Sequence, residues 1–490
     1  MIQIDRLLKH QISFYDLGDK RLNERSEKIH LSISTHGANK SFPDIFKDCH
    51  QLKSFYNFMN NKKVTSEKLQ RSTTNGLIDY FSNASNLSHH FDDDGLPNYL
   101  YNVQDTTYGK YHGRKSLELG YIETLHDNGI VIHNDVLMDS HHIPLALSGQ
   151  QFIIRDKSEF GKSKYRKSLP FEQKESHKWT QGIDWATNFT KQLSDSIDSP
   201  SSLNEQRIEI VQIADREADI ADWYNYAFAK KALFITRLNH NRLLKDKSSK
   251  VKDYIRKQAP QFQVTRPIVD KFGKVHEVNC AVCFAKVSLH ILNQPVWMVY
   301  LRALETVVNM EETEWFLLTN LPLDLPNKSN VFIHKMPMIV INAYTKRWRT
   351  VEDFHKCLKT GCAIEKRQFE SPHALKNMIT MMSVHAIRLL RMRHLADTKK
   401  QQPVQHILTP EETEVAKILA DKYLKPSDLE DALPESILWF VLLLGRMGGH
   451  QGYRRKGMPG WQTLFKGYLY FQNILEGIII SKNFFLKAPS

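Results

Sequence analysis

Two short apolar runs that end in a carboxylate constrain the fold of this chain more than any other feature. Glu209-Ile-Val-Gln-Ile-Ala reads as a strand that stops at Asp215, with a helix expected over residues 219–230. Residues 99–103 read as a second strand, which is expected to stop at Asp105. Strands that alternate with helices predict a mixed α/β core, and active-site groups emerge just beyond strand ends in such cores.

The length and charge of the chain limit its class. Its 490 residues predict roughly two to four domains. A formal net charge of +13 favours a polyanionic partner such as nucleic acid. A basic protein without such a partner fits the charge equally well, so the partner has to be argued from motifs.

The cysteines and the apolar runs indicate the compartment. Five cysteines at irregular spacing predict no disulfide framework and favour a reducing cytoplasm. The N-terminus lacks the basic head and apolar core of a signal peptide. The strongest apolar run, residues 437–445, is far too short to cross a bilayer, so no membrane association is expected.

Cys280-Ala-Val-Cys283 resembles half of a zinc site. The residues around it alternate as in a strand, with Val278, Cys280 and Val282 on one face. Cys283 then points to the other face, which does not suit shared ligation of one metal ion.

Periodicity divides the chain into three parts. Residues 1–85 read as small basic helices, with Arg21 and Arg25 on the first long one, and predict a DNA-binding domain; a solvated helix face is the alternative. Residues 86–370 read as an α/β catalytic domain with a β-rich insertion at about 238–313. Residues 371–490 read as helical.

A third carboxylate, Glu352, is expected to open an amphipathic helix. Together with Asp105 and Asp215, it gives three separated acidic side chains on two strands and a helix. Mg²⁺ takes oxygen ligands, and two such ions can hold the attacking and leaving oxygens of a phosphodiester displacement. Taken singly, Asp215 also suits a helix N-cap, and Glu352 suits a first-turn partner of the helix dipole.

The surroundings of these carboxylates resemble the bacterial insertion-sequence DDE transposases of the YREK subgroup, which act by cut and paste. The shared motifs are Asp105-Thr-Thr, Asp215-Arg-Glu-Ala-Asp-Ile220, the segment from Tyr344 to Glu352, Phe354-His-Lys356 and Lys359-Thr-Gly361. The resemblance extends over nearly the whole chain. It implies an RNase H-like core of the retroviral-integrase type, an N-terminal domain that binds the DNA ends, and C-terminal helices that join two subunits in a synaptic complex.

The resemblance also implies residue roles. Asp105, Asp215 and Glu352 would hold two Mg²⁺ (or Mn²⁺) ions. The residues expected to bind DNA phosphates near the reacting end are Tyr344, Arg347, Lys356 and Lys359.

For two further residues, the sequence leaves two alternative roles open. Trp315 matches the position at which the family stacks a flipped base, although a lone tryptophan more often lies in the core. Arg237, just beyond a strand, suits a DNA contact or a simple surface cation.

One departure from the family pattern concerns the spacing of Tyr344 and Glu352. The family places its glutamate seven residues after the tyrosine, whereas here the separation is eight. If the helix starts after Thr350, the extra residue is absorbed before it. The role of the family's arginine falls to Arg347, which keeps its spacing from Tyr344, with Arg349 as the alternative.

The sequence therefore predicts a DNA transposase of the bacterial cytoplasm, associated with the nucleoid when it is bound to DNA. It is expected to nick element ends, form and open a DNA hairpin, and join the ends to target DNA as a homodimer. The alternatives are an RNase H-like metal-dependent nuclease without strand transfer, and a catalytically impaired DNA-binding regulator.

Overall fold

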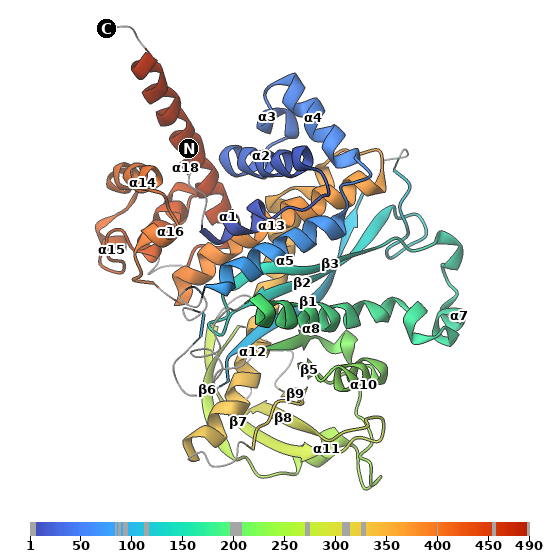
Figure 1. Cartoon of the computed structure of the whole chain (residues 1–490). Helices are drawn as coiled ribbons and strands as arrows, with labels where there is room; N and C mark the ends of the chain where they lie inside the picture. The colour runs from blue at the N-terminus through green and yellow to red at the C-terminus, as the bar shows by residue number, and fades with distance from the viewer. Residues whose placement is uncertain are drawn as a thin grey trace.

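In the computed structural model, one mixed sheet runs through the centre of the molecule (Figure 1). The structure describes residues 6–83, 86, 90–91, 97–111, 117–196, 208–269, 275–305, 314–324, 330–398, 400–452 and 457–487. The order across the sheet is β3-β2-β1-β4-β5-β9-β8-β7-β6. The strands are β1 (Tyr99–Lys110), β2 (Gly129–Met138), β3 (Pro144–Ile153), β4 (Glu209–Ala214), β5 (Leu233–Arg237), β6 (Phe262–Val269), β7 (Val275–Val287), β8 (Val296–Ala303) and β9 (Glu314–Thr319).

Strand direction changes on the two sides of β1. β1, β2 and β3 pair antiparallel in series, whereas β4 and β5 run parallel to β1. Parallel neighbours need crossover connections, and helices α8 (Lys178–Ser196) and α10 (Ala221–Ala229) lead into β4 and β5. The mixed α/β class predicted from the sequence is confirmed.

Strands β6, β7 and β8 extend the same sheet. β6, β7 and β8 form an antiparallel meander, β8 pairs with β9, and β9 pairs with β5. Strands β6, β7 and β8 and the short helix α11 (Val251–Arg256) lie in the range where the sequence predicts a β-rich insertion, and β9 follows it. The inserted strands therefore continue the central sheet sideways instead of forming another layer.

The prediction that a strand stops at Asp105 is wrong, because β1 continues to Lys110. Beyond Asp105, β1 still pairs with β2, as far as Lys110 opposite Gly129. The parallel pairing with β4 ends earlier, at Val103. Asp105 therefore lies where the neighbouring strand ends, inside a strand that goes on.

The prediction that Glu352 opens a helix is also wrong. Helix α12 spans Asn330–Lys356, and Glu352 lies about one turn before its C-terminal end. Met336 and Val340 are fully buried in the core beside the sheet, and this burial extends the helix well upstream of Tyr344. The extra residue between Tyr344 and Glu352 thus lies inside a continuous helix and is not absorbed before it.

The many charged residues of segment 156–178 predict an extended loop, but this segment contains short helices. They are η1 (Lys157–Glu159), α7 (Ser163–Ser168), η2 (Phe171–Gln173) and η3 (Glu175–His177). Arg155 donates to both carboxylate oxygens of Glu175, at 2.7 and 2.8 Å, and so ties this segment to the end of β3. We call residues 157–177 the arm; α7 stands out from the body in Figure 1.

The N-terminal helices pack on β3 and on the long helix α13 (Pro372–Thr398), and most of their apolar side chains share one core with α13. They are α1 (Arg6–Ser13), α2 (Lys20–His36), α3 (Phe42–Ile45), α4 (Cys49–Asn60) and α5 (Ser66–Ser82). Asn377 of α13 donates to the carbonyl oxygens of Met59 and Val64, at 3.0 and 2.8 Å. The predicted boundary at residue 85 lies outside the described residues, and the division into three domains stays a prediction.

A second apolar core lies among the C-terminal helices. These are α14 (Pro410–Tyr423), α15 (Pro426–Leu429), α16 (Ile437–Met447) and α18 (Trp461–Lys487), and α18 runs away from the body toward the C-terminus (Figure 1). Within the described ranges, no helix is both long enough and apolar enough to cross a bilayer.

Candidate active site

Asp105 and Asp215 lie at matching heights on neighbouring chain segments. Val103 of β1 pairs with Ile213 of β4, and each aspartate follows two residues later. Side chains two residues apart along a strand share a face. Val103 and Ile213 lie in the apolar core that includes Tyr344 of α12. The strand register therefore directs both aspartates toward α12, just where β4 ends.

Electrostatic coupling ties Glu352 to this pair. Burial, followed by the charge of Asp105, raises the pKa of Glu352. Burial also raises the pKa of Asp215; Arg347 opposes this shift, and the charge of Asp105 adds to it. Because like charges disturb a carboxyl group mainly at close range, Asp105 links the other two carboxylates into one cluster. Each of the three would be stabilised by a bound cation.

Arg347 is the buried cation of the cluster. Its Nη1 donates to Asp105 Oδ2 at 3.1 Å, and the residue is 5% exposed. Its Nε is buried and has no hydrogen-bond partner among the described residues. Its Cζ lies 5.5 Å from the ring centroid of Tyr344. Arg349, by contrast, is exposed. The geometry at the carboxylates thus involves Arg347, as its spacing from Tyr344 suggested.

The local alternatives for Asp215 and Glu352 have different outcomes. Asp215 is indeed an N-cap, because its Oδ1 accepts the backbone N–H of Glu217 at 2.8 Å. This bond leaves the second carboxylate oxygen of Asp215 for other partners. Glu352 is not a first-turn residue, because it lies near the C-terminal end of α12.

Trp315 and Arg237 lie beside Tyr344. The Trp315 ring meets the Tyr344 ring edge-on, with centroids 5.8 Å apart. The Arg237 guanidinium lies 5.9 Å from the Trp315 ring centroid. Trp315 is half-buried, so its ring packs against the core and still presents part of its surface to solvent.

Lys356 and Lys359 follow Glu352 along the chain. Lys356 is exposed at the end of α12, and Lys359 is half-buried in the π-helical turn Cys357–Gly361. The charges of both lysines lower the pKa of Glu352, in opposition to its burial. The two cations therefore lie near the carboxylate cluster.

Arg21 and Arg25 are not part of this cluster. Both are exposed on α2, among the N-terminal helices and away from α12 (Figure 1). The structure thus brings nine of the eleven predicted site residues to one region and places these two on another.

Two more residues lie near the cluster. The sequence predicts no role for Trp348, whereas Glu217, beside Asp215, is predicted to help position metal or DNA, with a purely structural role as an equal alternative. Trp348 is 60% exposed although it directly follows the buried Arg347. Glu217 is exposed, and its pKa is raised first by partial desolvation and also by the charges of Asp215 and Asp105, so it is a fourth carboxylate in the same region. The signal for Glu217 was its place in the Asp215–Ile220 motif. The exposure of Trp348 could not be predicted from the apolar periodicity, because it depends on which face α12 turns toward the sheet.

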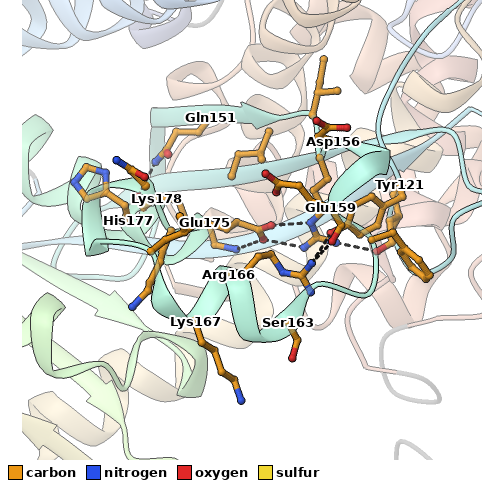
Figure 2. A pocket seen from close by; sticks show the side chains of 18 of the residues that line it. Tyr121, Gln151, Asp156, Glu159, Ser163, Arg166, Lys167, Glu175, His177 and Lys178 are labelled. Atoms are coloured by element: carbon orange, nitrogen blue, oxygen red, sulfur yellow. Dashed lines mark hydrogen bonds and ion pairs between the residues drawn. The ribbon is translucent and has the colours of Figure 1, made fainter.

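A groove of about 1130 Å³ lies between the arm and the end of β3 (Figure 2). Arg166 donates from Nη1 to the carbonyl oxygen of Glu159 at 2.6 Å and to the hydroxyl of Tyr121 at 3.3 Å, which fixes the arm over the groove. Lys178 lines the inner end, with its Nζ 3.9 Å from Glu217. The groove therefore reaches the region of the carboxylates.

The middle of the arm is basic. Residues 160–168 carry four cations and no carboxylate. Lys162, Lys164 and Lys167 are exposed, and Tyr165 is 51% exposed among them. Cations interleaved with an exposed aromatic ring suit a phosphate backbone and its bases.

Comparison with known proteins gives a match to a family model and a remote likeness to a solved structure. Residues 5–64 match the sequence model of the transposase DNA-binding family. A solved cryo-EM structure, a piggyBac transposase synaptic complex with hairpin DNA, aligns with 91% of this chain and 90% of that chain, at 11% identity and a TM-score of 0.32. The matched segment holds α1 to α4 with Arg21 and Arg25, and it is similar to the DNA-binding region of transposases.

Proposed function

We propose that this protein is a DNA transposase of the DDE type. The observation that carries the proposal is the meeting of Asp105, Asp215 and Glu352, from two adjacent parallel strands and a crossing helix. It occurs in a chain whose residues 5–64 match a transposase DNA-binding family. Neither feature alone specifies the reaction, but together they favour metal-assisted cutting and joining of DNA.

The topology of the core supports an RNase H-like assignment. In the order β3-β2-β1-β4-β5, three antiparallel strands are followed by two that run parallel to β1. The strands that meet at the carboxylates are β1 and β4, at the centre of that half-sheet. This arrangement agrees with the fold that the sequence motifs imply.

The residues present fit a site for two Mg²⁺ (or Mn²⁺) ions. Their carboxylate oxygens are ligands that hard cations prefer, and burial with mutual repulsion makes the ionised cluster costly without a cation. Asp105, Asp215 and Glu352 would hold the ions. When bound, the ions would activate the attacking oxygen and neutralise charge at the phosphodiester.

The other residues of the site would hold and orient DNA. Arg347 donates to Asp105 through Nη1, and the positive charge that it holds beside the carboxylates would attract a phosphate bound there. The ammonium groups of Lys356 and Lys359 lie near Glu352 and would bind further phosphates. Trp348 offers an exposed indole ring, and Trp315 a partly exposed one, for stacking against a base displaced from the duplex.

The proposed reaction is a series of displacements at phosphorus. Water first attacks a phosphodiester at the element end, and a 3′-OH leaves. That 3′-OH then attacks a phosphodiester of the opposite strand, which closes a hairpin on the element end and releases the 3′-OH of the flanking DNA. A second water hydrolyses the hairpin phosphodiester and regenerates the 3′-OH of the element end. This 3′-OH finally attacks a phosphodiester of target DNA, and a 3′-OH of the target strand leaves. Two copies of the chain, joined through the C-terminal helices, would hold two ends together, in bacterial cytoplasm at the nucleoid.

One observation favours the alternative of an impaired DNA-binding regulator. At about 100° per residue, a separation of eight places Glu352 about 80° around the helix from Tyr344, whereas a separation of seven would place it about 20° to the other side. Because α12 is continuous over this stretch, the rotation is not absorbed before Glu352.

An assay with three separable products distinguishes the candidate functions. Full-length protein is incubated with Mg²⁺, labelled DNA cloned from both flanks of its gene, and a target plasmid. Nicked ends, hairpins and joined plasmid together support the transposase. Cleavage without joining would indicate a nuclease, and specific binding without cleavage would indicate a regulator.

A further inference from the structure

Three polar side chains form a row across the sheet on its α12 side. Asp105 of β1 lies opposite Asn134 of β2, and Asn134 lies opposite Gln150 of β3. Residues directly opposite each other share a face. Asn134 is fully buried and Gln150 nearly so. Buried amides need partners for both their oxygen and their nitrogen, and here those partners connect α13 to α12.

The hydrogen bonds of this row have a fixed direction. Thr380 of α13 donates to Gln150 Oε1 at 2.8 Å. Gln150 Nε2 donates to Asn134 Oδ1 at 2.8 Å. Asn134 Nδ2 donates to His355 Nε2 of α12 at 3.1 Å. Gln150 Nε2 also donates to Ser383 Oγ of α13 at 2.9 Å, so both ends of the Gln150 amide are held on α13. The connection to α12 then runs from Gln150 Nε2 through the Asn134 amide to His355.

His355 is a suitable acceptor at the end of this chain. It is 6% exposed, and burial, with smaller contributions from Lys359 and Arg347, lowers its pKa to about 3. The imidazole is therefore neutral near pH 7, and its Nε2 carries a lone pair for Asn134. Among the described residues this bond is a direct polar link between β2 and the last turns of α12.

Glu352 lies between two attachments of α12 to the sheet. Arg347 bonds to Asp105, and His355, about one turn after Glu352, bonds to Asn134. Immediately after Lys356 the α-helix gives way to the π-helical turn Cys357–Gly361. The His355 attachment thus fixes the rotation of the helix where its regular hydrogen bonding ends.

We propose that Asn134 is a positioning residue, which acts through His355 to hold the carboxylate of Glu352 beside Asp105. The inference rests on the proposed metal site, since Glu352 is one of its ligands. Hydrogen bonds behind metal ligands commonly change metal affinity by about 10- to 100-fold. The same size of effect is expected here, without any contact between Asn134 and the ion.

The test is Mn²⁺ binding to the full-length protein without DNA, followed by electron paramagnetic resonance. Asn134→Ala is expected to weaken Mn²⁺ binding about tenfold. The matched control is Asn102→Ala, which removes an equally buried asparagine from β1 that bonds to Gln212 and Ser148 instead. The control is expected to bind Mn²⁺ within about twofold of the unmodified protein.

Variants of His355 keep the proposal testable if Asn134→Ala does not fold. His355→Gln retains an acceptor for Asn134 and is expected to keep most of the affinity, whereas His355→Leu is expected to lose it. The double variant Asn134→Ala, His355→Leu is expected to bind no more weakly than the weaker single variant, because both remove the same bond.

Two results would overturn the inference in distinguishable ways. If folded Asn134→Ala and His355→Leu bind Mn²⁺ normally while Glu352→Gln binds weakly, the metal site is supported and the positioning role of Asn134 is refuted. If Glu352→Gln also binds normally, the metal site fails, and with it the proposed function on which the inference depends.

Discussion

The two faces of β1 are both polar and buried, but they differ in charge. On the α8 side, Asn102 Nδ2 and Gln104 Nε2 donate to Gln212 Oε1, at 2.9 and 2.7 Å, in a network of neutral amides. On the α12 side, Asp105 belongs to a cluster of carboxylates in which the contacting buried cation is Arg347. The first network fixes the core, and the second leaves negative charge that a ligand can neutralise.

Asp135 shows how the α8 side avoids charge. It lies opposite Gln104 in the strand register, so it points to the same side. Burial raises its pKa to about 7, against an opposing hydrogen bond with Asn102. The group is therefore protonated over most of the acidic range. The comparison teaches that buried polar side chains do not by themselves indicate a functional site. Carboxylates whose negative charge exceeds that of the nearby cations do indicate one.

The largest effect is expected from neutralising the charged face. Asp105→Asn and Asp215→Asn are expected to reduce DNA cleavage on the order of 10³-fold or more. Binding of end DNA is expected to be retained, because cations hold the phosphates. The melting temperature of Asp215→Asn is expected not to fall, since a neutral amide relieves repulsion and asparagine still caps the following turn. The melting temperature of Asp105→Asn is expected to fall, because the buried Arg347 loses its charged partner.

The matched control neutralises the other face. Asp135→Asn is expected to cleave at the unmodified rate near pH 7. If Asp135→Asn abolished cleavage as completely as Asp215→Asn, the distinction between the two faces would be lost.

The aromatic residues at the α12 side separate stacking from packing. Trp348→Ala is expected to reduce hairpin formation by roughly 10- to 100-fold with little change in first-strand nicking or melting temperature, because one base stack contributes about 1–3 kcal/mol. Trp315→Ala is expected to lower the melting temperature as well, because its ring packs on Tyr344. Equal losses of nicking and hairpin formation in Trp348→Ala, measured on denaturing gels, would remove the stacking role.

The arm leads into α8, on the side of β1 that carries the neutral amides. Variants of its lysines test whether cations on this side bind DNA phosphates. Replacing Lys162, Lys164 and Lys167 together by Glu is expected to weaken DNA binding and to reduce the slope of log affinity against log salt by about 2–3, since each phosphate contact contributes about 0.9. Reversal of Lys417 and Lys422 on α14 is the control. An unchanged salt slope in the arm variant would show that DNA does not contact the arm.

The smallest effect concerns stability and pH. Because the folded pKa of Asp135 is about 7 and so lies above its unfolded value, the folded state binds the extra proton between the two. This contribution to stability is complete below the unfolded pKa and is lost as pH rises through about 7.

The melting temperature of the unmodified protein is therefore expected to fall relative to Asp135→Asn between pH 5 and 8. Parallel melting curves across that range would contradict the burial of an ionisable group on the α8 side.

Local patterns sufficed to predict part of this architecture. The opposite orientation of Cys280 and Cys283 follows from strand alternation and is confirmed, because the two lie in different apolar clusters. The strands that carry Asp105 and Asp215 could also be placed from apolar runs. The end of β1 could not be predicted in this way, because β1 pairs with β2 beyond the point where its pairing with β4 ends.

Longer-range features needed tertiary contacts that a single sequence does not display. The start of α12 depends on burial of Met336 and Val340 against the sheet. The opposition of Asn134 and Gln150 depends on a bulge beside Asp135 that resets the pairing of β2 with β3. A local reading of the polar stretch in β2 therefore cannot connect it to Glu352.

The measurement that tests the central claim most directly is strand joining by Glu352→Gln, because Glu352 is the carboxylate whose spacing departs from the family pattern. Full-length protein is incubated with Mg²⁺, labelled flanking DNA and plasmid, and joined products are counted after a single turnover. We predict that the unmodified chain joins DNA, whereas Glu352→Gln binds the same DNA and yields no joined product. Joining by Glu352→Gln at the unmodified rate would contradict the assignment of the α12 face as the active site.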